Sequence, residues 1–295
     1  MTVGVAVLLV VQMMLWGTAF PMIKIALGDL SAPHLTLLRH VVASAAFLPL
    51  LLGFRARLLP RRQDVPFFLL LGVIGYTVYH LALNYGQTNV SAGAASLIIA
   101  TAPAITALLA VVMVGERLPA AGWVGSAISF VGVALIVVGD SGGVRFNVYA
   151  WLIVLAAVST SFYAILQRRL FDRYRPIEVA AFATWAGTVP MLAFAPGVVA
   201  DVAAASTRAL LATVYIGVFP SAVAYTIFAF ALSRAPVTVV AAALYMVPVF
   251  SLIASWLLVG EVPGPLTVVG GAVAIGGIVL LNVAKQRFAR QLARA

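Results

Sequence analysis

The sequence of 295 residues contains no cysteine and very little charge. The absence of cysteine excludes disulfide bonds, thiolate metal sites and thiol nucleophiles. Charged residues make up 9% of the chain, whereas hydrophobic residues make up 64% and the mean hydropathy is +1.13. Because so few polar side chains cannot cover the surface of a soluble protein of this size, we expect the lipid bilayer to be its main solvent.

Several motifs of catalysis are missing as well. The chain has no Gly-rich Walker segment followed by Lys-Ser or Lys-Thr, which excludes nucleotide hydrolysis by that route. It has no Gly-x-Ser-x-Gly segment, and its three histidines, between positions 34 and 80, have no acidic neighbour inside a predicted helix. We therefore predict that the protein is not an enzyme and needs no cofactor or metal, and an intramembrane enzyme is the least favoured alternative.

Long apolar runs fill almost the whole chain. A bilayer core about 30 Å thick needs roughly 20 apolar residues for each helical crossing, and ten runs of that kind are present. The sequence therefore predicts an all-α polytopic membrane protein with ten transmembrane helices. The predicted helices cover residues 4–27, 33–53, 66–86, 91–113, 119–139, 147–167, 176–199, 208–231, 236–259 and 265–284.

The net charge of +10 is explained by where the basic residues lie. With the N-terminus in the cytoplasm, fourteen of the eighteen lysines and arginines fall on cytoplasmic segments, and only Arg145 and Arg208 fall outside. This distribution follows the positive-inside rule and predicts both termini in the cytoplasm, most simply at the plasma (inner) membrane. Basic loops of this kind indicate topology rather than a nucleic-acid partner.

The two halves of the chain are related. At an offset of 145 residues Pro103 aligns with Pro248 and Glu116 with Glu261, as do several glycines. Each half contains five predicted crossings, an odd number, so the second half must be inverted relative to the first. The predicted units are a first repeat over residues 1–140, a second repeat over residues 147–284 and a cytoplasmic basic tail over residues 285–295.

A family resemblance rests on four short segments. They are WGTAFPMIK at residues 16–24, Arg39 after Pro33, and VGE at both 114–116 and 259–261. In these segments the chain resembles the EamA-type drug/metabolite transporter superfamily. The resemblance implies a ten-helix carrier with both termini in the cytoplasm that exports amino acids or other small metabolites.

Proline and glycine mark expected points of movement and of close packing. Pro103 and Pro248 lie within matched crossings, where each removes an intrahelical hydrogen bond; both are candidate gating hinges, or else static kinks. Gly125, Gly132 and Gly139 recur every seven residues, and Gly270 and Gly277 repeat part of that stripe. Small residues on one helix face predict close helix packing, within the bundle or between protomers.

Two ionisable side chains lead the candidates for a substrate site. His80 lies midway along the third predicted crossing, and it could bind substrate, carry a coupling proton or form a plain interhelical hydrogen bond. Arg39 could hold a substrate carboxylate through its planar guanidinium or brace two helices through backbone carbonyls. Aromatic and amide side chains could complete the pocket or serve only as packing. These further candidates are Trp16, Tyr76, Tyr79, Asn84, Tyr163, Trp185 and Tyr245.

The function predicted from these features is secondary transport. Inverted repeats are characteristic of carriers, because two similar halves can expose one central site to each side in turn. We expect a small-molecule substrate, most simply an amino acid moved outward by alternating access, and a channel or facilitator is the main alternative. The scarcity of acidic residues inside the crossings favours a uniporter, or an exchanger that uses His80 as its proton carrier. The sequence sets neither the substrate nor the oligomeric state.

Overall fold

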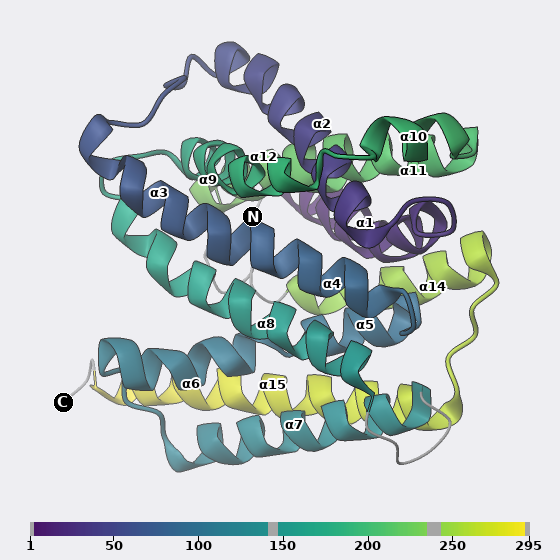
Figure 1. The fold of residues 1–295 in the computed structure, drawn as a ribbon. Helices are drawn as coiled ribbons and strands as arrows, with labels where there is room; N and C mark the ends of the chain where they lie inside the picture. The colour runs from purple at the N-terminus through teal and green to yellow at the C-terminus, as the bar shows by residue number, and fades with distance from the viewer. Residues whose placement is uncertain (1–2, 141–146, 235–242, 293–295) are drawn as a thin grey trace.

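The computed structural model describes residues 3–140, 147–234 and 243–292 (Figure 1). Over these residues the chain is helical and contains no β-strand, and nine of its helices are long and apolar enough to cross a membrane. A tenth apolar helix, over Leu244–Val259, is shorter, and the first residues of the predicted 236–259 crossing lie outside the described part. The predicted all-α polytopic membrane protein is confirmed.

Several crossings are built from two or three consecutive helices. The elements of the first half are α1 (Val3–Ala26), α2 (Ala32–Gly53), η1 (Arg62–Asp64), α3 (Val65–Gly72), η2 (Val73–Val78), α4 (Tyr79–Gln87), α5 (Ala92–Ile99), α6 (Ala102–Val114) and α7 (Ala120–Asp140). Those of the second half are α8 (Val148–Leu166), η3 (Gln167–Leu170), α9 (Pro176–Met191), η4 (Leu192–Phe194), α10 (Val198–Ala204), α11 (Thr207–Val218), η5 (Phe219–Val223), α12 (Ala224–Arg234), η6 (Leu244–Met246), α14 (Val247–Val259) and α15 (Pro265–Leu292).

Two predicted boundaries need correction. The crossing predicted over 176–199 ends at Phe194, because Pro196 cannot donate a backbone hydrogen bond and Gly197 turns the chain with φ 84°. The separate short helix α10 then follows. At the other boundary, helix α15 continues beyond residue 284 as far as Leu292, so the predicted basic tail begins within the same helix as the last crossing.

The connections between crossings gather at two ends of the bundle. At one end Glu116 pairs with Lys285 and Arg168, and the 54–64 connection bonds to residues 173–178; we call this the basic end. At the other end the backbone N–H of Ala92 donates to Glu261, and Arg208 donates to the carbonyl of Leu258; we call this the Glu261 end. In Figure 1 the basic end is on the left and the Glu261 end is on the right. The matched residues Glu116 and Glu261 therefore lie at opposite ends.

Helices α7 and α15 lie side by side and antiparallel (Figure 1). Their contact follows the predicted glycine stripe, because a Cβ on Gly125 would lie 2.6 Å from the carbonyl oxygen of Gly277 and one on Gly132 would lie 2.4 Å from the nitrogen of Ala274. Only glycine permits the two backbones to approach so closely. Of the two readings of the stripe, the structure therefore selects packing within the bundle.

The repeat is visible in local backbone structure as well as in sequence. Helices α6 and α14 both end at a glycine in the left-handed conformation, Gly115 with φ 74° and Gly260 with φ 68°. A left-handed residue at this position is nearly always glycine because a Cβ would clash with the backbone. The π-helical turns η2 and η5 also occupy corresponding positions in the two halves.

Candidate functional site

Two π-helical turns bring the two halves of the chain together near the middle of the bundle. Such turns insert an extra residue into an α-helix and recur at functional sites. In η5 the hydroxyl of Ser221 donates to the carbonyl of Ile216 at 2.7 Å. In η2 the hydroxyl of Thr77 donates to the carbonyl of Gly187 on α9 at 2.8 Å and lies 3.5 Å from the carbonyl of Gly72. The side chains of Tyr76 and Ser221 emerge from these turns.

A chain of aromatic rings runs between the two π-turns. The Tyr76 ring lies 5.5 Å from that of Tyr163 on α8 and 6.5 Å from that of Tyr225 on α12, centroid to centroid. Tyr225 in turn meets Trp16 on α1 at 5.4 Å, edge to face. The indole N–H of Trp16 donates to the carbonyl of Pro220 in η5 at 3.1 Å. Residues from both halves therefore share one aromatic surface, which we call the central cluster.

Arg39 is the charged member of the central cluster. Its side chain is only 5% exposed, and its Nε donates to the Ser221 hydroxyl at 3.1 Å. Its Nη1 is buried and has no hydrogen-bond partner. The four ion pairs found among the described residues lie at the two ends of the bundle, and none includes Arg39. A guanidinium is always charged, so burying one inside the bilayer without an ion-pair partner costs free energy unless an anion binds to it.

Two histidines adjoin the arginine. The His40 and His80 rings are 4.4 Å apart, and each donates its Nδ1–H to the carbonyl four residues earlier, that of Thr36 or Tyr76. Tyr79 lies edge to face against His80 at 4.5 Å. With Nδ1 occupied in this way, the opposite ring nitrogen of each histidine is the one left for other partners.

Asn84 extends this polar network by one helical turn. Its Nδ2 donates to the Thr36 hydroxyl at 2.8 Å, and its buried Oδ1 has no hydrogen-bond partner. Thr36 is also the residue whose carbonyl accepts the His40 N–H. The structure therefore brings seven of the nine predicted site residues into one connected region. They are Trp16, Arg39, Tyr76, Tyr79, His80, Asn84 and Tyr163.

Two predicted site residues make their contacts elsewhere. The Trp185 indole N–H donates to the carbonyl of Ser44 at 3.0 Å, and its ring packs on Phe182. The Tyr245 hydroxyl is bonded by the amide of Asn282 on α15, and its ring packs against the cluster formed by α6 and α15. Tyr245 therefore lies outside the central cluster, whereas Trp185 packs against the same hydrophobic core as Tyr76 and Tyr163 but donates its hydrogen bond away from Arg39.

Sequence reasoning missed Ser221 and Tyr225. The repeat offset would have indicated both, because Ser221 corresponds to Tyr76 and Tyr225 corresponds to His80 at 145 residues. At the same offset Arg39 corresponds to Thr184, whose hydroxyl donates to the carbonyl of Ala180. The charged group therefore occurs in one of the two repeats only.

The two candidate hinge prolines lie where a crossing is broken. Pro103 stands in the first turn of α6, just after the break at Ala100–Thr101, and Pro248 stands in the first turn of α14, after η6. A proline in the first turn of a helix costs little, because the N–H it lacks has no intrahelical partner there. Each proline therefore fixes the start of a half-helix, and the hinge role stays a prediction.

Ion pairing perturbs carboxyl groups at both ends of the bundle. The hydrogen bond from Lys285, at 2.8 Å, lowers the pKa of the Glu116 carboxyl, and the nearby Arg168 acts in the same direction while partial burial opposes them. At the Glu261 end the hydrogen bond from His34 lowers the pKa of the Asp201 carboxyl. Both carboxylates therefore stay charged near neutral pH and fasten the connections between crossings.

These features define an integral membrane protein of the transporter class: apolar helices cross the bilayer, and two related halves enclose buried polar groups. The model of the EamA-like transporter family matches residues 4–138 and again residues 147–283. The chain belongs to this family, and the family resemblance predicted from the sequence is confirmed.

Relatives that carry transporter names point to transport as well. The chain is 40% identical over 274 residues to a protein of Streptantibioticus cattleyicolor named "Probable terminal-alkyne amino-acid exporter", covering 93% of this chain and 92% of that one. It is 38% identical to the uncharacterized transporter YdfC of Bacillus subtilis, covering 90% and 86%. It is 27% identical to the pseudopaline exporter CntI of Pseudomonas aeruginosa, covering 90% and 91%. These names place the chain among transporters, which points to a role other than catalysis.

A solved crystal structure shares the fold. It matches 98% of this chain and 99% of its own with a TM-score of 0.67 at 20% sequence identity.

Proposed function

We propose that this protein is a secondary transporter that exports amino acids by alternating access, and that Arg39 binds the carboxylate of the substrate. The observation that carries the proposal is the buried Arg39 guanidinium, which has one hydrogen bond, to Ser221, and an unpartnered Nη1. A substrate carboxylate would supply the missing charge and hydrogen bonds, since guanidinium and carboxylate groups pair in a bidentate geometry.

The aromatic rings beside Arg39 suit the rest of an amino acid. Trp16 and Tyr225 offer apolar surface and ring faces that attract an ammonium group. His80 and Asn84 supply polar atoms in the same connected region, and the Asn84 Oδ1 has no hydrogen-bond partner. Arg39 comes from the first half and Ser221 from the second. Movement of one half against the other would therefore change the contacts of a substrate held between them.

Orientation follows from charge. We propose that the basic end faces the cytoplasm and that the protein resides in the plasma (inner) membrane, because loops rich in lysine and arginine are retained on the cytoplasmic side. Export is supported by the names of two relatives, one an amino-acid exporter and the other a pseudopaline exporter. Under this proposal the chain has no enzymatic activity of its own.

The test is counterflow in proteoliposomes that contain the purified full-length chain. Vesicles loaded with one unlabelled amino acid at a time are diluted into the labelled compound, with and without a pH gradient. The proposal expects saturable uptake that is accelerated by the substrate inside. Flux that rises linearly with concentration and ignores the internal substrate would instead indicate a channel, and no flux of any amino acid would overturn the proposal.

A further inference from the structure

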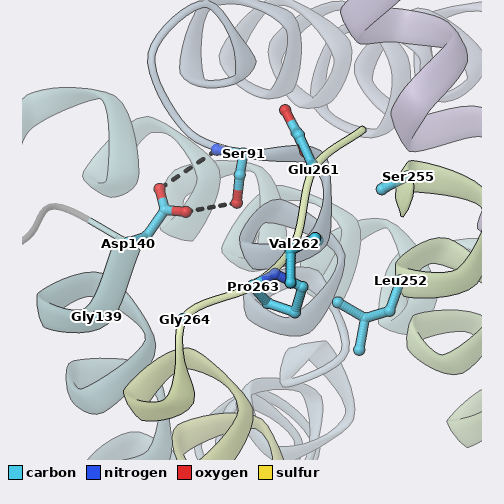
Figure 2. Close-up of a pocket in the computed structure, with 10 residues that line it drawn as sticks. Ser91, Gly139, Asp140, Leu252, Ser255, Glu261, Val262, Pro263 and Gly264 are labelled. Carbon is cyan, nitrogen blue, oxygen red and sulfur yellow. Dashed lines mark hydrogen bonds between the residues drawn. The ribbon is translucent and has the colours of Figure 1, made fainter. Parts of the chain in front are cut away.

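A pocket lies at the Glu261 end, away from the central cluster (Figure 2). It has a volume of about 270 Å³ and is bordered by the start of α5, the end of α7, the end of α14 and the 260–264 connection. The first half supplies Ser91 and Asp140, and the second half supplies Ser255 and Glu261. The pocket therefore spans the two halves of the chain.

The charge of this pocket is negative. Asp140 and Glu261 contribute two carboxylates, and the described residues that line the pocket include no lysine or arginine. Helices α7 and α14 end here, and helices α5 and α15 begin here, so the positive and negative helix ends balance. The two full charges of Asp140 and Glu261 therefore decide the sign and favour a cation.

The carboxylates retain acceptor capacity after binding the start of α5. Glu261 accepts the backbone N–H of Ala92 at 2.7 Å, and Asp140 accepts from the N–H and the hydroxyl of Ser91. Figure 2 shows Asp140 and Glu261 on either side of Ser91. An ionised carboxylate has about four acceptor positions, so these bonds leave positions free on both groups.

The second, independent observation is Ser255. Its side chain is 1% exposed, its Oγ has no hydrogen-bond partner, and it lines the pocket. Figure 2 shows Ser255 on α14 beside the connection that carries Glu261. A buried hydroxyl of this kind normally bonds the carbonyl one turn earlier or a ligand, because leaving it unpaired costs free energy. Here the hydroxyl is available to accept from a donor inside the pocket.

We propose that this pocket binds a small organic ammonium group. A primary ammonium has three N–H donors, which matches the acceptors of Asp140, Glu261 and Ser255. Leu252 and Pro263 supply apolar surface for a short alkyl chain. The volume exceeds what a bare metal ion needs and suits an alkylammonium. With the orientation proposed above, this site faces the outside of the cell and is separate from the carboxylate site at Arg39.

Thermal unfolding of the purified full-length protein with propylammonium chloride tests this site directly. Because a ligand that binds only the folded state raises its stability with concentration, the wild-type protein should show a saturable rise in Tm. Sodium chloride at equal ionic strength and tetramethylammonium, which has no N–H donor, should give no saturable rise. A rise of equal size with tetramethylammonium would overturn the proposal.

Four variants complete the test. Glu261→Gln and Asp140→Asn should each raise the half-saturating propylammonium concentration about tenfold, as loss of a charged hydrogen bond does. Ser255→Val should also weaken the response, although both carboxylates keep their hydrogen bonds to the start of α5. Arg39→Gln should respond as the wild type does, so failure of the amino-acid transport proposal and failure of this site are told apart. An unchanged response in the three pocket variants would show that propylammonium binds elsewhere.

Discussion

The Nε of Arg39 on α2 donates to the hydroxyl of Ser221 in the π-turn η5 at 3.1 Å, and this bond joins the first half of the chain to the second inside the bilayer. Ser221 also donates to the carbonyl of Ile216, so its position is fixed by the turn. The arginine is thereby held in place with Nη1 free of protein partners. A preorganised cation of this kind suits a carboxylate that must bind and leave repeatedly.

Substitution of Arg39 should separate its charge from its geometry. Arg39→Gln removes both, and we expect transport at subsaturating substrate to fall at least about tenfold, as expected for losing a charged hydrogen bond. Arg39→Lys retains the charge without the planar fork and should be intermediate. Arg208→Gln is the matched control, because Arg208 donates to a carbonyl at the Glu261 end. Equal transport by Arg39→Gln and Arg208→Gln would remove Arg39 from the substrate site.

The contact between α7 and α15 should depend on single glycines. A Cβ on Gly277 would lie 2.5 Å from both the carbonyl oxygen of Gly125 and the nitrogen of Ser129, so Gly277→Ala must push the helices apart. We expect a loss of roughly 1–3 kcal/mol in the free energy of unfolding, the usual cost of overpacking. Gly276→Ala is the control, since nothing lies within 4 Å of its Cβ. Chemical unfolding in detergent measures both, and similar losses would contradict the packing described.

The ion pairs of Glu116 should make stability depend on pH. The pKa of its carboxyl is lowered in the folded protein, chiefly by the Lys285 hydrogen bond, so the stabilisation is complete above the ordinary glutamate range and is lost as the pH falls through the folded-state pKa. From about pH 6 to about pH 3 the wild type should therefore lose more Tm than Glu116→Gln does. The effect should be modest because Lys285 and Glu116 are each about a third exposed. Parallel profiles of Tm against pH for the wild type and Glu116→Gln would contradict this role of the Glu116 ion pairs.

The prolines at the two helix breaks should matter more for movement than for folding. Pro103→Ala and Pro248→Ala restore a backbone N–H at the start of α6 and α14 and permit a continuous helix. We expect each to lower the transport rate by a larger factor than the folded yield. Pro49→Ala, in the interior of α2, serves as the comparison. Losses of rate and yield by the same factor at Pro103 and Pro248 would assign them a structural role only.

The transmembrane helices were predictable because their signal is local. An apolar run of about 20 residues indicates a crossing wherever it packs, and the two proline-broken crossings were visible from Pro103 and Pro248. Identities at the 145-residue offset, such as Glu116 with Glu261, also revealed the repeat before any contact was known. The positions of the crossings, their proline breaks and the repeat could therefore be predicted from the sequence.

Contacts between helices were harder to predict. Tyr245 is an aromatic residue inside a predicted crossing, as the other aromatic candidates are. Its hydroxyl nevertheless accepts a hydrogen bond from Asn282 on α15, more than thirty residues away. The π-turns contribute a second difficulty, because one extra residue in a turn rotates all following side chains by about 100° relative to an ideal helix. Seven of the nine predicted residues share the central region nonetheless, since polar groups inside the bilayer must find one another.

The inverted arrangement of the two halves is tested most directly by the sidedness of Glu116 and Glu261. The chain has no cysteine, so single cysteines at their exposed neighbours, Arg117→Cys and Val262→Cys, can be labelled without a background. In intact cells a membrane-impermeant maleimide should label Val262→Cys, and Arg117→Cys should react only after the membrane is permeabilised. Labelling of both cysteines from the same side of the membrane would contradict the inverted repeat and the transport mechanism built on it.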